Sequence, residues 1–165
     1  MIEHPLPFHK LKIQKKKSLV AIIENVIKGG ENHMFRNLYA IEDGKEVDIL
    51  EDGGNSCGVF VSWILLALEL IKRPHATVYA TEMDLVSSGW YKIKDLKAGA
   101  VLVWEDVSGD LLGEKAKHRH IGFYIGNDMA VSSDSVLRTI VKHHYTYEGK
   151  RKIEKIFWHS ELDNE

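Results

Sequence analysis

The only cysteine of the chain, Cys57, lies in the segment Gly-Gly-Asn-Ser-Cys-Gly-Val-Phe-Val, where we expect a helix to begin. The glycines end the preceding segment, and Asn55 and Ser56 are residue types that favour the N-cap position. The free backbone N–H groups of a first helical turn and the positive end of the helix dipole both favour thiolate over thiol. Since the thiolate is the nucleophile, Cys57 is a candidate catalytic residue. The alternative is that Cys57 is a small apolar residue buried at a helix start.

A histidine at the start of a predicted strand supplies a second candidate group. In the segment His-Ile-Gly-Phe-Tyr-Ile-Gly, residues 120–126, apolar residues alternate with the others, as in a strand with one buried face. With the apolar residues in the core, His120 stands on the opposite face, beside the open space that Gly122 leaves. An imidazole in that position suits a general base that acts on a neighbouring thiol. The alternative is a chance placement, because the chain contains nine histidines.

The elements that must position these two residues predict an α+β fold. The helix that begins at Cys57 has apolar residues on almost every face, and nothing interrupts it before Pro74, so we expect it to be enclosed. Short β-prone segments follow it. We therefore predict a central buried helix that carries Cys57 and packs on an antiparallel β-sheet. The predicted strands are residues 101–104, 120–125 and 129–133, with a last pair within 138–147 and 152–158.

The remaining segments are predicted from residues that begin or end helices and strands. Ser18 can cap a helix from Leu19 to about Lys28, which Gly29 and Gly30 would end. The other predictions are a short helix or strand over 33–41, a polar connector over 42–52 with a turn at Asp43-Gly44, a β-prone segment over 75–80 and a helical turn over 84–88.

The composition is that of a globular protein and excludes several classes of function. The 165 residues are 44% apolar and 28% charged, with a formal net charge of −2, so we expect neither nucleic acid nor a membrane as a partner. A single cysteine excludes an intramolecular disulfide and a multi-cysteine zinc site. The most apolar stretch, residues 59–71, is too short to span a bilayer. The N-terminus lacks the pattern of a signal peptide, so we expect a cytoplasmic location.

Three segments in order along the chain resemble the NlpC-type cell-wall cysteine peptidases of the papain-like superfamily. They are Ser-Cys-Gly-Val-Phe-Val, Leu-Lys-Ala-Gly-Ala-Val-Leu-Val-Trp and His-Ile-Gly-Phe-Tyr-Ile-Gly-Asn, within residues 53–135. The resemblance implies a papain-like domain over residues 18–165 after an N-terminal arm over 1–17. It also implies Cys57 as nucleophile and His120 as base, acting on amide bonds of peptidoglycan-type peptides. The chain departs from the family at Ser56 and Ala100, where the family has aspartate, and it lacks the usual upstream tyrosine.

The third catalytic residue has two candidates. The family places a polar residue twelve positions after the base, which is Ser132 here. A three-residue loop would pair Ile125 with Met129, and Ser132 and Asp134 would then both lie on the face of His120, with Asp134 directly opposite. Asp134 is the better chemical partner for an imidazolium. A two-residue loop would shift the register by one and bring Ser133 and Ser135 to that face instead.

Other histidines do not have the spacing of a familiar metal site. His118, His120, His143 and His144 have no carboxylate or cysteine at ligand spacing, so we expect no metal and no cofactor. His144 could also enter the active site from the following strand. The run Lys15-Lys16-Lys17 is typical of a solvated face.

Three functions are consistent with these residues. The first is a cysteine peptidase or amidase that hydrolyses a peptide or amide substrate. The second is a thiol acyltransferase, in which a lipid or an amine replaces water. The third is a catalytically inactive binding module with the same fold.

Overall fold

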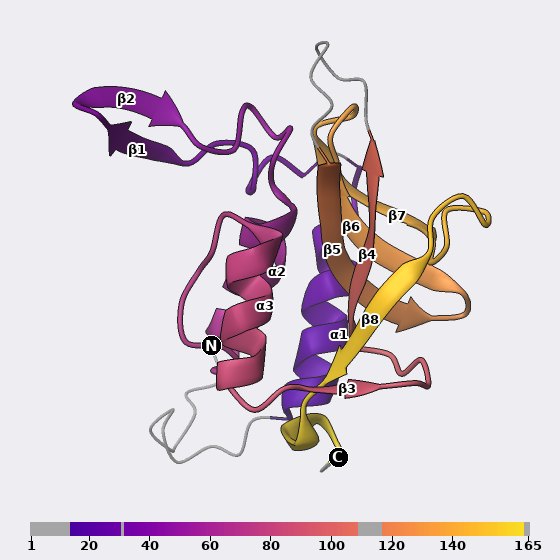
Figure 1. The fold of residues 1–165 in the computed structure, drawn as a ribbon. Coiled ribbons are helices and arrows are strands. Elements are labelled where there is room, and N and C mark those ends of the chain that lie inside the picture. The colour runs from indigo at the N-terminus through magenta and orange to yellow at the C-terminus, as the bar shows by residue number, and fades with distance from the viewer. Residues whose placement is uncertain (1–13, 31, 109–116, 164–165) are drawn as a thin grey trace, which may run out of the picture.

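A six-stranded antiparallel sheet and three helices form the body of the protein (Figure 1). The computed structural model describes residues 14–30, 32–108 and 117–163. The strand order is β3-β8-β4-β5-β6-β7, and each neighbouring pair is antiparallel. Mixed helices and antiparallel strands confirm the α+β prediction. The strands are β3 (Tyr91–Ile93), β4 (Val101–Ser108), β5 (Lys117–Gly126), β6 (Met129–Asp134), β7 (Thr139–His144) and β8 (Ile153–Trp158).

The helices lie beside this sheet, and a small hairpin stands away from both (Figure 1). Helices α1, α2 and α3 each contact β5. The hairpin forms a separate two-stranded sheet. In the described part of the chain, no helix is both long and apolar enough to cross a membrane. The remaining elements are α1 (Lys15–Val26), β1 (Tyr39–Glu42), β2 (Lys45–Asp48), α2 (Cys57–Ala67), α3 (Val78–Ser87) and the 3-10 helix η2 (Ser160–Leu162).

Helix α2 is buried along most of its length and begins at Cys57, as predicted. It packs on β5 and β6, and Phe60 meets Phe123 of β5 edge to face, with the ring centroids 5.6 Å apart. The helix ends at Ala67 instead of reaching Pro74, and the chain turns at Glu69, which has a φ of 56°. Ser56 occupies the N-cap position, but its hydroxyl donates to the Phe35 carbonyl and does not cap the helix.

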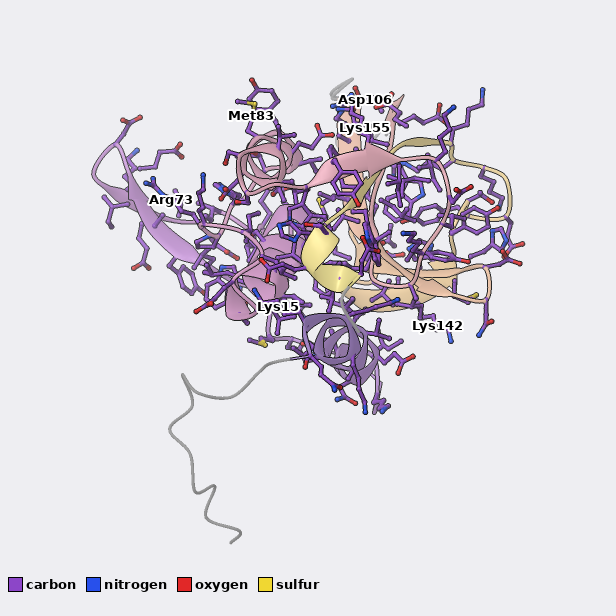
Figure 2. All side chains as sticks on the ribbon, turned by 90° about the horizontal axis from the view of Figure 1, so that it is seen from below. Lys15, Arg73, Met83, Asp106, Lys142 and Lys155 are labelled. Carbon is purple, nitrogen blue, oxygen red and sulfur yellow. The ribbon has the colours of Figure 1, made fainter. Side chains whose placement is uncertain are left out.

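Helix α3 begins in the segment predicted as β-prone, over residues 75–80, and runs through most of the helical turn predicted over 84–88. The prediction over residues 75–80 was wrong because the Thr77 side chain accepts a hydrogen bond from the Ala80 backbone N–H, at 3.2 Å, and caps a helix that starts at Val78. This local bond outweighs the weak β-propensity of the branched residues. Met83 of α3 points away from the body (Figure 2).

The N-terminal part also differs from the prediction. Helix α1 begins at Lys15, not Leu19, so it includes the lysine run and the last three residues of the predicted arm over 1–17; residues 1–13 lie outside the described part. Residues 39–48 form the β1–β2 hairpin, with Asp43 and Gly44 in the turn at positive φ. The predicted connector over 42–52 therefore contributes a strand.

The hairpin between β5 and β6 combines the two loops that the sequence offered. Its turn has two residues, Asn127 and Asp128, both at positive φ. A two-residue turn would shift the register, but a bulge between Tyr124 and Gly126 inserts one residue on β5. Gly126 thus pairs with Met129, and farther along Gly122 pairs with Ser132. The expected Ile125–Met129 pair was wrong, whereas the side of the sheet predicted for Ser132 was right.

Candidate active site

The Cys57 sulfur lies where the start of α2 meets β5. The side chain is buried, with 8% of the residue exposed. Backbone N–H groups of Ile121, Gly58 and Cys57 itself stabilise the charged form, but burial has the larger effect and raises the pKa of the thiol. A position at a helix start predicted a lowered thiol pKa, and this prediction was wrong. Burial removes more hydration from the sulfur than the N–H groups of the first helical turn replace. The resting group is a neutral thiol.

His120 lies on β5 directly before Ile121, whose backbone N–H contacts the Cys57 sulfur. It pairs with Trp104 on the neighbouring strand β4, and the centroids of the two rings are 5.5 Å apart. Its Nε2 lies 2.9 Å from Ser132 Oγ. Burial, and next the positive charge of Arg151, lower the pKa of His120 to about 3. The imidazole is therefore neutral near pH 7, and this low pKa weakens it as a base in the resting protein.

Ser132 is the centre of a buried polar cluster. Its Oγ contacts His120 Nε2, His143 Nε2 at 2.8 Å and the Tyr147 hydroxyl at 3.0 Å. His143 Nδ1 lies 2.8 Å from the His144 carbonyl oxygen. Ser132 has no exposed surface. Every hydrogen-bonding direction of the hydroxyl is therefore used by protein groups.

Close backbone approach at Gly122 makes this cluster possible. A Cβ atom on Gly122 would lie 2.7 Å from Ser132 Cβ and 2.6 Å from the Val131 carbonyl oxygen. Any larger residue would push β6 away from β5. The glycine in the histidine segment is thus required by the packing of Ser132 against His120.

The direction of each hydrogen bond follows from the carbonyl at the end of the chain of bonds. The His144 carbonyl only accepts, so His143 Nδ1 carries the hydrogen. Burial lowers the pKa of His143, which is therefore neutral near pH 7, and its Nε2 accepts the Ser132 hydroxyl proton. Ser132 has no second proton, so its oxygen accepts from the Tyr147 hydroxyl and from His120 Nε2–H. This assignment leaves the lone pair of His120 on Nδ1.

His120 Nδ1 has no hydrogen-bond partner among the described residues. No fully buried side-chain nitrogen in that part of the chain lacks a partner, so solvent must reach Nδ1. No hydrogen bond joins it to the Cys57 sulfur within the same residues. The sulfur instead contacts the backbone N–H of Ile121, the residue that follows His120. In enzymes without substrate, catalytic hydrogen bonds are often long and shorten in the complex.

Of the two candidates for the third residue, the structure brings Ser132 to His120. The Asp134 carboxylate accepts from the backbone N–H groups of Val136 and Leu137, both at 2.8 Å, and makes no hydrogen bond with His120. Asp134 still acts at longer range, since its charge favours protonation of His143. The turn after β6 therefore binds the Asp134 carboxylate, although a carboxylate would be the stronger partner for a histidine.

Sequence reasoning missed His143, Tyr147 and Arg151. His143 pairs with Ala130 and is the diagonal neighbour of Ser132, which pairs with Val141. A correct β6–β7 register would have placed His143 on the face of Ser132. The His144 side chain, which was considered for this role, instead contacts Thr146.

The charge of Arg151 acts on several groups of this site. Its Nε and Nη2 donate to the Glu105 carbonyl at 3.2 and 3.1 Å, and its guanidinium carbon lies 6.0 Å from the centre of the Tyr147 ring. Its positive charge lowers the pKa values of both Cys57 and His120. Arg151 therefore favours a thiolate beside a neutral imidazole.

The candidate site has no obvious metal-binding set. In the described ranges, no three His, Cys, Asp or Glu side chains are grouped so that they could hold a metal ion.

Comparison of the chain with protein-family models and with curated proteins finds no match.

Proposed function

We propose that this chain is a cysteine-dependent hydrolase of amide bonds, with Cys57 as nucleophile and His120 as base. The observation that carries the proposal is the hydrogen bond from His120 Nε2 to Ser132, because it leaves Nδ1 with the lone pair that a base needs. The contact of the Cys57 sulfur with the Ile121 backbone supports a common site for thiol and imidazole. The resemblance to NlpC-type peptidases suggests a papain-like arrangement and peptidoglycan-type peptides as substrates.

In the proposed reaction, the Cys57 sulfur attacks the amide carbonyl carbon while His120 Nδ1 takes the thiol proton. Because the resting thiol is neutral, proton transfer accompanies the attack. The imidazolium, held by Ser132 through Nε2, then protonates the amine as the carbon–nitrogen bond breaks, and a thioester remains on Cys57. Water loses a proton to His120 and attacks the thioester carbonyl carbon, the carbon–sulfur bond breaks and the acid leaves, and the imidazolium returns the proton to the Cys57 sulfur. The backbone N–H of Cys57 is a candidate donor to the oxyanion.

One observation favours a second function, that of a catalytically inactive binding module. Burial raises the pKa of the Cys57 thiol, and a structural cysteine behaves in the same way. The two functions differ in what the neutral His120 does. In the hydrolase it removes the thiol proton, whereas in the binding module it only packs against Trp104 and hydrogen-bonds with Ser132.

A thioester-trapping experiment tests the proposal. The wild type and Cys57→Ala are incubated with synthetic peptides that include peptidoglycan-type stem peptides, and products and intact protein masses are measured after an acid quench. The hydrolase should release a free acid and show an acyl adduct on Cys57, whereas Cys57→Ala should show neither. Turnover by Cys57→Ala would contradict the mechanism. A product that forms only when hydroxylamine is added would identify an acyltransferase, and the absence of both adduct and product would favour the binding module.

A further inference from the structure

We propose that His143, which lies on β7, is a positioning residue that acts through Ser132 and fixes the tautomer of His120 that can serve as base. This inference rests on the proposed function, but its first test does not depend on activity. The geometry behind it is an unbroken series of contacts: His120 Nε2 to Ser132 Oγ at 2.9 Å, Ser132 Oγ to His143 Nε2 at 2.8 Å, and His143 Nδ1 to the His144 carbonyl at 2.8 Å.

Ser132 cannot fix the tautomer without an acceptor of its own. A serine hydroxyl both donates and accepts, so by itself it can donate to His120 Nε2 as readily as it can accept from it. Donation would put the lone pair on Nε2 and the hydrogen on Nδ1, and the Cys57 proton could not be taken. His143 Nε2 removes this choice because it takes the only Ser132 proton. The residue twelve positions after the base is therefore insufficient on its own in this chain.

The surroundings of His143 hold its ring in the orientation that this task requires. The His144 carbonyl accepts from Nδ1, which makes Nε2 the acceptor. The Tyr147 ring stacks on the imidazole at 4.0 Å between centroids and 21° between planes. The Trp104 ring lies 5.7 Å away and donates its own N–H to the Tyr145 carbonyl. The ring of His143 is thus held by two hydrogen bonds and two aromatic neighbours.

Two substitutions separate the acceptor from the shape of the ring. His143→Phe keeps an aromatic ring against Tyr147 but removes the acceptor, whereas His143→Gln keeps a side-chain oxygen that can accept from Ser132. Tyr147→Phe is the matched control, because it removes a donor to Ser132 and leaves the His143 acceptor in place.

The first readout is the tautomer of His120, measured by ¹⁵N chemical shifts of the ring nitrogens near neutral pH. We expect hydrogen on Nε2 in the wild type, His143→Gln and Tyr147→Phe, and hydrogen on Nδ1 or a mixture of both forms in His143→Phe. Wild-type ¹⁵N shifts in His143→Phe would overturn the proposal. If His143→Phe does not fold, His143→Leu, which also lacks the acceptor for the Ser132 proton, provides the same test.

The second readout is the rate at which iodoacetamide alkylates Cys57. We expect His143→Phe to react about 10- to 100-fold more slowly than the wild type, the range typical for loss of the hydrogen-bond partner of a metal-ligating histidine, and His143→Gln to recover most of the rate. Equal rates in His143→Phe and the wild type would overturn the positioning role. If the tautomer changes in His143→Phe while His120→Gln alkylates at the wild-type rate, His143 fixes the tautomer and it is the proposed function that fails.

Discussion

Folding stability should depend on pH through His120, because the residue is kept neutral in the folded protein. Burial lowers its pKa from 6.5 to about 3. Below the unfolded value, the unfolded chain binds a proton that the folded protein does not bind, so this histidine makes stability fall as pH decreases from about 6.5 towards 3. The contribution is fully present above the unfolded pKa and is lost on acidification.

The magnitude follows from the same two values. At about pH 5 the unfolded histidine lies roughly 1.5 pH units below its pKa, and each unit corresponds to about 1.4 kcal/mol, so the free energy of unfolding should fall by about 2 kcal/mol relative to pH 7.5. In His120→Gln this contribution is absent. His143, whose pKa burial also lowers, is present in both proteins.

Urea unfolding of both proteins at about pH 7.5 and about pH 5 measures the effect. The wild type should lose about 2 kcal/mol more than His120→Gln between these conditions. His33→Gln, which replaces an exposed histidine, is the matched control and should keep the wild-type loss. An equal loss in the wild type and His120→Gln would refute the burial of a neutral imidazole at this position.

Three further predictions concern the packing and ionisation of the site. Gly122→Ala should lower the free energy of unfolding by about 1–3 kcal/mol in urea titrations, because its Cβ would lie 2.7 Å from Ser132 Cβ; unchanged stability would contradict this close approach. Trp104→Phe should cost about 1–3 kcal/mol in the same assay, because it leaves the Tyr145 carbonyl without its 2.7 Å donor, and a neutral result would show that the bond contributes nothing. In His120→Gln, alkylation of Cys57 should keep rising with pH past 9, since burial raises the pKa of the thiol above its usual 9.0; a plateau near neutral pH would indicate a thiolate at rest.

Patterns of sequence predicted those parts of the site that depend on local structure. The glycines before Cys57 and the apolar run after it determined where α2 begins. The alternation in residues 120–126 determined which face of β5 carries His120. Both signals are local, because a helix start and a strand face are set by neighbours within a few residues.

What the sequence could not predict depends on contacts between distant segments. The bulge between Tyr124 and Gly126 compensates for the register shift of a two-residue turn. It was not predicted, because it depends on how β5 pairs with β6. His143 reaches Ser132 only through the β6–β7 register. The pKa of Cys57 depends on enclosure by β5, which outweighs the helix start. Asp134 was favoured on chemistry, but the turn that follows β6 uses its carboxylate.

The most direct test of the account compares alkylation of Cys57 by iodoacetamide near neutral pH in the wild type and in His120→Gln. Cys57 is the only cysteine of the chain, so the adduct reports one site. If His120 Nδ1 takes the thiol proton, the wild type should react about 100-fold faster or more, the lower end of what a positioned general base supplies. Equal rate constants in the two proteins would contradict the claim that Cys57 and His120 act together.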